Sequence, residues 1–190
     1  RKVMKMLDEE GHVRTVKGQP SIVTYQASPE TYAGFLVQGR DEIADAYKGL
    51  ELLMPIFYRE GARRCRAPEL RLLHGLTDRI SDHMEHEELY RQAHAFYAVL
   101  LRPLNNQLIM DLEVDSEHFL YTPYIPLPGT KNPFTLTAAR LKNWMYDAVC
   151  QIEHRQFDDF YNKIVNDYRE SAKRVDGYLH SLSRHIPAPP

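Results

Sequence analysis

The apolar positions near the end of the chain recur at helical spacing. Over residues 141–152 they fall at i, i+3, i+4, i+7, i+8 and i+11, and residues 157–168 repeat the same series. A stripe of this width is typical of a helix that packs one face against a core. Further apolar residues continue the second stripe as far as Leu182. The pattern therefore predicts two long amphipathic helices in this region.

The middle of the chain shows the same period, and no strand pattern follows residue 40. Apolar stripes at helical spacing cover three segments, 43–57, 70–80 and 89–104. The third stripe is broken at Asn105-Asn106, and a fourth helix is expected from Gln107 to about Leu120. Together with the last two helices, these segments predict an all-α bundle of six or seven helices over residues 41–185.

Proline marks the irregular parts of this predicted bundle. Residues 121–133 contain four prolines and a glycine and are expected to form its one long loop. The ending IPAPP, residues 186–190, cannot continue a helix and is expected to fray.

The first 26 residues carry a different pattern. RKVMKMLDEEG places Val3, Met6 and Leu7 on one helical face, and Gly11 is a helix stop. HVRTVKGQPSIVTY then alternates, turns at residues 17–20 and alternates again, which predicts a β-hairpin with a basic tip. A helix followed directly by such a hairpin is the second half of a winged helix-turn-helix DNA-binding domain, although an ordinary surface hairpin fits the pattern too. Residues 27–40 are expected to form a linker or a short helix.

Composition and charge narrow the class of protein. The 190 residues carry a net charge of −2, which argues against a chain that binds nucleic acid along its whole length. The first nineteen residues nevertheless hold more Lys and Arg than Asp and Glu. Two cysteines are too few for a disulfide framework, and no run of 18 apolar residues exists, so we expect a cytoplasmic protein without membrane spans.

The segment VMKMLDEEGHVRTVKGQPSIV resembles the recognition helix and wing of the GntR family of transcription regulators. The helical remainder is similar to the sensing domain of the FadR subfamily: PLNNQLIM resembles its break between two helices, and AVCQIEH and FYNKIVNDYRES its closing helices. The resemblance implies a homodimer on a palindromic DNA operator, with a small-molecule effector bound in the helical domain. It also implies that the chain begins inside the recognition helix, with the preceding helices missing, and that its DNA-contacting residues are Arg1, Lys17, Gly18 and Gln19.

The metal site of most relatives is not matched in this sequence. Its first two ligands would fall at Ala93 and Tyr97, or at Gln92 and Phe96 in the neighbouring register. The histidine of the last helix would be replaced by Arg169, and the one before it would lie near Lys142 or Asn143. We therefore expect no metal of the family kind and no other cofactor.

Aromatic residues stand where the relatives hold this metal. An aromatic pocket with one buried cation suits an amphipathic acid, such as a fatty acyl-CoA, because a buried cation needs an anionic partner. The alternative is that these residues are ordinary core. The predicted effector site consists of Ala93, Phe96, Tyr97, Trp144, Tyr146, Tyr168 and Arg169, with Tyr161 nearby.

Other chemistry is weakly represented. His83, His86 and Glu87 have a spacing that can hold zinc, so a helical metal-binding protein or enzyme is one alternative function. A purely structural interaction module is another. The basic neighbours of Cys65 are expected to lower the pKa of its thiol, but no catalytic triad or phosphate-binding loop is visible. The sequence thus favours a binding protein over an enzyme.

Overall fold

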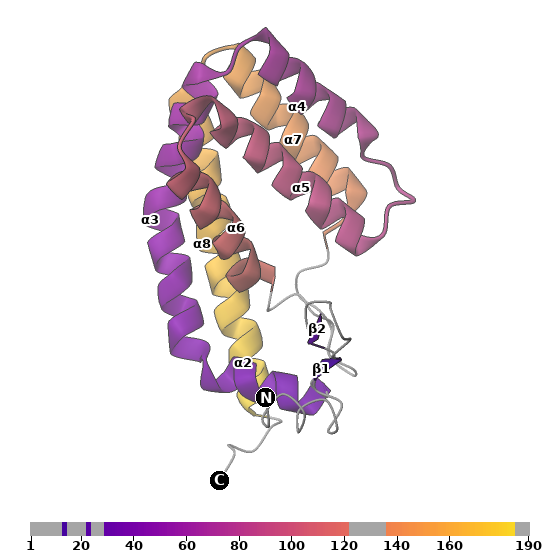
Figure 1. Cartoon of the computed structure of the whole chain (residues 1–190), viewed down its shortest axis with the longest axis vertical. Helices are drawn as coiled ribbons and strands as arrows, with labels where there is room; N and C mark the ends of the chain where they lie inside the picture. Colours follow the sequence, from indigo (N-terminus) through magenta and orange to yellow (C-terminus); the bar gives the residue numbers. More distant parts are fainter. Residues whose placement is uncertain (1–12, 15–21, 24–28, 122–135, 185–190) are drawn as a thin grey trace.

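The computed structural model describes residues 13–14, 22–23, 29–121 and 136–184. In this part of the chain the structure is mainly helical, as the sequence predicts, with seven α-helices and one 3₁₀ turn (Figure 1). The helices are α2 (Pro29–Gln38), α3 (Arg40–Arg64), α4 (Ala67–Arg79), α5 (His86–Leu101), α6 (Gln107–Tyr121), α7 (Ala138–Glu153) and α8 (Phe157–Ser183), with η1 (Arg102–Leu104) after α5.

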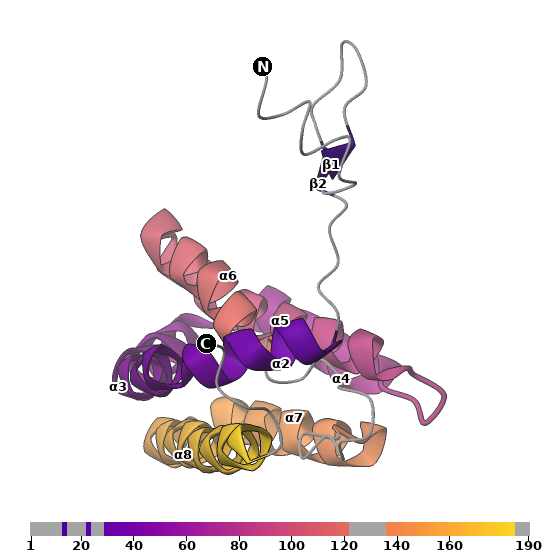
Figure 2. The same ribbon diagram turned by 90° about the horizontal axis from the view of Figure 1, so that it is seen from below.

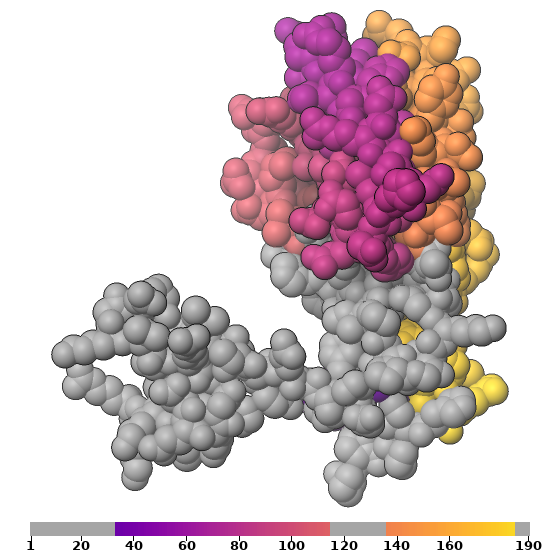
Figure 3. All heavy atoms as spheres, turned by 90° about the vertical axis from the view of Figure 1, so that its right-hand side faces the viewer, coloured from indigo at the N-terminus to yellow at the C-terminus, as the bar shows by residue number. Residues whose placement is uncertain are grey.

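Two long helices, α3 and α8, form the spine of the bundle. They lie side by side and run in opposite directions, because α3 ends and α8 begins at the same end of the molecule (Figure 1). The shorter helices α4, α5 and α7 pack beside the end of the spine where α3 meets α4. The space-filling view shows α4 and the start of α5 on the surface, with α6 on one side and α7 on the other (Figure 3).

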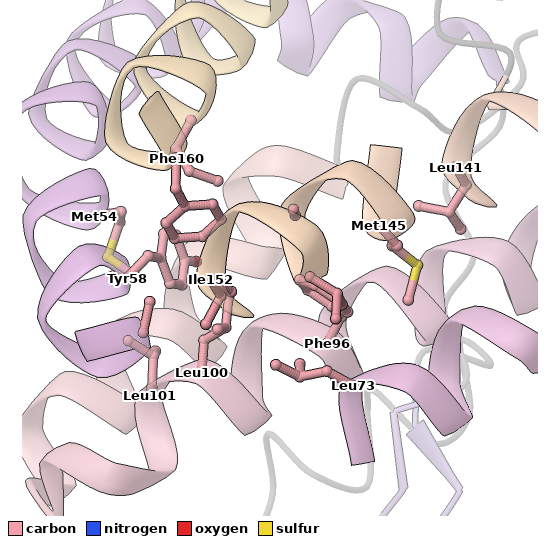
Figure 4. Close-up of a cluster of buried hydrophobic side chains, with 14 of the residues drawn as sticks. Met54, Tyr58, Leu73, Phe96, Leu100, Leu101, Leu141, Met145, Ile152 and Phe160 are labelled. Atoms are coloured by element: carbon pink, nitrogen blue, oxygen red, sulfur yellow. The ribbon is translucent and has the colours of Figure 1, made fainter. Parts of the chain in front are cut away.

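The main hydrophobic core fills the space between α3, α4, α5, α7 and α8. Its largest members are fully buried, and they come from all five helices (Figure 4). The predicted stripe of α7 supplies Leu141, Met145 and Ile152. Each large apolar side chain buried in this way stabilises the fold by roughly 1.5–3 kcal/mol.

A second core cluster lies between α2 and the far half of the spine. Ala33 and Leu36 of α2 are buried against Tyr47 of α3 and Leu179 of α8. Of the two structures expected for residues 27–40, a linker or a short helix, the structure has a helix, and α2 is packed as part of the bundle. The neighbouring helices α3 and α8 give it its packing partners.

The break between η1 and α6 lies where the sequence predicts it. Asn105 adopts the left-handed conformation, with φ 48°, which Asn tolerates better than most residues. The turn lets the chain reverse from α5 into α6.

Gly61 allows α3 to approach α5 unusually closely. A Cβ atom at this position would lie 1.9 Å from the carbonyl oxygen of Leu100. No residue with a side chain fits this contact without a shift of the backbone. The contact matters for the site described below, because Tyr58 and Tyr97 lie about one helical turn before Gly61 and Leu100, respectively.

The N-terminal segment contributes two short strands, β1 (Val13–Arg14) and β2 (Ile22–Val23). They pair antiparallel, with Val13 opposite Val23 and Arg14 opposite Ile22. The predicted preceding helix and the turn of the hairpin lie outside the described residues, so the winged helix stays a prediction. Among the helices that are described, none combines the length and the apolar character that crossing a bilayer requires.

Candidate functional site

A buried polar cluster lies between α3, α5 and α6. Its central group is the carboxylate of Glu113 on α6, which is only 4% exposed and accepts a hydrogen bond from the hydroxyl of Tyr58 on α3. His94 of α5 places its Nδ1 3.9 Å from a Glu113 oxygen. We call Tyr58, His94, Tyr97 and Glu113 the interior polar cluster.

The helical phase of α6 brings Glu113 into the interior. Ile109, Met110 and Leu112 of the same helix pack against the main core, and Glu113 follows Ile109 by four residues. Residues four apart share a helix face, so the carboxylate occupies a position that an apolar residue normally takes. Sequence reasoning missed both Glu113 and Tyr58. The available signal was a glutamate in phase with the apolar stripe of the predicted helix.

The environment of this cluster has clear electrostatic consequences. Burial raises the pKa of Tyr58 well above its usual value, and the nearby Tyr168 and Glu113 raise it further, so the phenol stays a hydrogen-bond donor. Burying a carboxylate costs several kcal/mol unless hydrogen bonds compensate it. The hydroxyl of Tyr58, a residue of α3 that lies 55 positions before Glu113 in the sequence, donates the compensating hydrogen bond.

Aromatic rings continue the cluster toward α7. The ring centroids of Tyr58 and Tyr97 are 4.6 Å apart, and those of Tyr97 and Trp144 are 5.6 Å apart. Phe96 contacts Trp144 edge-on, with centroids separated by 5.7 Å. Aromatic pairs at these distances attract one another beyond simple burial. We call Tyr58, Tyr97, Trp144 and Phe96 the aromatic row.

Trp144 is held at the far end of this row by polar groups. Its indole N–H donates to Asp167 of α8, and the Lys163 ammonium lies 5.5 Å from the centre of its ring. Burial raises the pKa of Asp167, although the hydrogen bond from Trp144 and the charge of Lys163 oppose the shift. The orientation of the indole is therefore fixed by contacts with α8.

Several residues of the predicted effector site come together. Phe96, Tyr97 and Trp144 form three members of the aromatic row. Tyr168 is buried and close enough to Tyr58 to affect its pKa, and Ala93 packs against the same core.

Two other residues of the predicted site do not line the interior. Tyr146 is 58% exposed, because it lies on the outer side of α7. The side chain of Arg169 is 57% exposed, and its Nε donates to Glu51 of α3 at 2.6 Å. The prediction that Arg169 is a buried cation is thus wrong, because its guanidinium is paired with Glu51 at the surface. Tyr161, the remaining aromatic, is half-buried under the guanidinium of Arg59.

The other candidate residues fall into two groups. Arg1, Lys17, Gly18 and Gln19 lie outside the described residues. For the alternative metal site at His83, His86 and Glu87, the described part of the chain contains no group of three or more His, Cys, Asp or Glu side chains placed to hold a metal ion.

The thiol of Cys65 also differs from the prediction. Burial, with a smaller contribution from Glu69, raises its pKa to about 11, so the basic neighbours in sequence do not make it a reactive thiolate.

No family model matches this chain, and no curated protein or solved structure matches it. The resemblance to the GntR family therefore stays a prediction from the residues quoted above. The geometry of the interior offers a carboxylate, an imidazole and phenols beside flat aromatic surfaces.

Proposed function

We propose that this chain is the ligand-sensing part of a DNA-binding transcription regulator of the GntR type. The observation that carries the sensing role is the buried Glu113, hydrogen-bonded to Tyr58 and next to the aromatic row. A polar cluster of this kind costs stability compared with an apolar core, and ligand sites combine apolar walls with a few such polar groups. The DNA-binding role rests on the sequence of residues 1–26.

The packing of α6 supports a role in sensing. This helix carries Glu113 and packs mainly on α3 and α5, while its outer end projects away from the other helices (Figure 2). Leu108 and Val114 of α6 are largely exposed. Among the described residues α6 has few neighbours, and such a helix shifts at lower cost than one packed on all sides. A ligand that contacts Glu113 would therefore favour one position of α6 over another.

The connection of α3 to the N-terminal segment supports the coupling to DNA. Tyr58 belongs to α3, and α3 packs against α2, which directly follows the predicted DNA-binding segment. A ligand that shifts α3 relative to α8 would change how α2 is held. In a homodimer, such a change alters the spacing of the two DNA-binding segments and hence the affinity for a palindromic operator.

The ligand class follows from the interior groups. The aromatic row suits an apolar or planar body, and Glu113 suits a hydroxyl or ammonium donor. An acid, which the family resemblance implies, would have to contact His94, because Arg169 lies at the surface. We therefore propose an amphipathic metabolite with a polar head group that contacts Glu113.

Trp144 allows a direct test, because it is the only tryptophan of the chain. A medium-chain fatty acid, its CoA thioester, the matching alcohol and the matching amine are titrated while Trp144 fluorescence and the melting temperature are followed. We expect at least one probe to change the fluorescence in a saturable way and to raise the melting temperature by mass action. Glu113→Gln should weaken this response, whereas the surface variant Tyr146→Phe should leave it unchanged.

The DNA-binding part is tested separately with the full-length protein. We expect it to bind a palindromic duplex with an affinity that falls steeply as salt increases, and the active probe should change that affinity. Absence of any response to all four probes would refute the sensing role. Absence of salt-dependent DNA binding would refute the regulator.

A further inference from the structure

Arginines surround a surface depression at the corner where α3 ends and α4 begins. This corner lies at the opposite end of the spine from α2 (Figure 1). The depression has a volume of about 510 Å³. It is lined by Arg63, Arg64, Cys65, Arg66, Glu69 and Pro103. We call Arg63, Arg64 and Arg66 the arginine corner.

The positive charge of this corner is only partly compensated. Arg63 forms an ion pair with Glu60 at 3.0 Å. Glu69 uses its carboxylate to accept the backbone N–H of Arg66 at 2.9 Å. Within the described ranges, no ion pair joins a carboxylate to the side chain of Arg64 or Arg66. A local excess of positive charge thus stands on a chain whose net charge is −2.

Glu69 shows that the corner stabilises an anion. Its pKa is lowered, mainly by hydrogen bonds from the backbone N–H groups of Arg66 and Glu69, and also by the charges of Arg102 and Arg66. This carboxylate is held at the start of α4 by backbone N–H groups. Arg102 of η1 adds a fourth positive charge.

Packing holds part of the corner in place. The guanidinium of Arg63 lies 5.8 Å from the ring centroid of Phe157, and that of Arg155 lies 6.0 Å from the same ring. Arg63 is therefore placed by Glu60 and Phe157 together. Side chains that are positioned before binding lose less entropy when a ligand arrives.

We propose that the arginine corner binds a small ligand that carries a diphosphate group. Guanidinium groups match the geometry of phosphate oxygens and form paired hydrogen bonds with them. Two guanidinium groups that form no ion pair within the described ranges, those of Arg64 and Arg66, stand beside Arg63 at one hollow and favour a ligand with more than one negative charge. The volume of the depression lies in the range of small-molecule sites, which favours such a ligand over the surface of a macromolecule. This site is separate from the interior polar cluster and does not depend on the regulator function.

Calorimetric titration with inorganic pyrophosphate and with ADP tests the proposal. We expect pyrophosphate to bind with a dissociation constant below about 1 mM at low salt, and the affinity should fall as salt is added. The double variant Arg64→Gln/Arg66→Gln should weaken binding at least about tenfold, because charge-assisted hydrogen bonds are lost. The matched control Arg71→Gln/Arg79→Gln removes the same charge from exposed positions of α4 and should bind like the unchanged protein.

Each result decides the proposal. Tighter binding of ADP than of pyrophosphate supports a nucleotide, and equal or tighter binding of pyrophosphate supports a free diphosphate. No binding at about 1 mM pyrophosphate overturns the site, as does equal weakening in the two double variants. Circular dichroism of all variants establishes that they are folded, so a loss of binding reports on the arginines.

Discussion

Replacing Gly61 with alanine tests how closely α3 and α5 must approach. The new Cβ would lie 1.9 Å from the carbonyl oxygen of Leu100 and 2.9 Å from its carbonyl carbon. Ordinary contact needs about 3.5 Å, so the two backbones must separate by more than about 1 Å. The obstacle is backbone, and no side-chain rotation relieves it. Leu100 and Leu101 are also fully buried, so their helix has little room to retreat.

The expected free energy follows from two opposing effects. Alanine is favoured over glycine inside a helix by about 0.8–1.0 kcal/mol. Overpacking a well-filled interior costs about 1–3 kcal/mol and sometimes more. Because the clash is with backbone, we expect the upper part of this range, and a net loss of about 2 kcal/mol of unfolding free energy.

Two glycines of the same bundle provide matched controls. Gly49 lies in α3 itself and Gly75 in α4, and a Cβ at either position meets no atom within 4 Å. Gly49→Ala and Gly75→Ala should therefore stabilise the protein by about 0.4–1 kcal/mol. Chemical denaturation followed by circular dichroism measures all three variants. For a chain of this size each kcal/mol shifts the melting temperature by roughly 2–4 °C.

The sign of the change decides this prediction. If Gly61→Ala were as stabilising as Gly49→Ala, the close approach of α3 and α5 would be refuted. A second readout connects the contact to the candidate site. Moving α5 away from α3 should separate Tyr97 from Tyr58 and change the environment of Trp144, so its fluorescence should change in Gly61→Ala and stay constant in Gly49→Ala.

Three further experiments test the electrostatics of individual buried side chains. Tyr58→Phe removes the donor to buried Glu113 and should cost about 1.5–3 kcal/mol in chemical denaturation; a cost near zero would show that the hydrogen bond is not formed. Burial raises the pKa of Asp167, so the native state keeps this proton to higher pH than the unfolded chain, and stability is lost as pH rises from about 4 through the raised value. Asp167→Asn, which keeps an acceptor for Trp144, should therefore raise the melting temperature more near pH 7 than near pH 4, and an equal shift at both would contradict the assignment. Cys65, with a pKa of about 11, should react slowly with iodoacetamide near pH 8 in the native state and much faster after unfolding, as measured by mass spectrometry; equal rates would contradict its burial.

Helix positions could be predicted because they depend on local periodicity. The stripes of α7 and α8 place Met145 and Ile164 in the core, and both are fully buried. The break at Asn105-Asn106 was visible as well, because Asn readily takes the left-handed backbone that ends a helix. For Phe96, Tyr97 and Trp144, the stripe indicated an inward position, and the structure brings the three rings together.

The environment of residues at the edges of these stripes could not be predicted. Arg169 follows the buried Tyr168, but it faces Glu51 at the surface because α3 packs along that side of α8. Tyr146 follows the buried Met145 and lies on the outer side of α7. A helical pattern gives the phase of each side chain, but it does not say which neighbouring helix covers it.

The sequence alone determined which segments after residue 40 are helical and which face of each is apolar, because these properties depend on residues within a few turns of one another. The tertiary structure decided the rest. It made α2 part of the bundle, and it brought Gly61 against Leu100. It also paired Tyr58 with Glu113. Such pairings join residues far apart in the chain, and they are fixed by the way several helices fill one interior together.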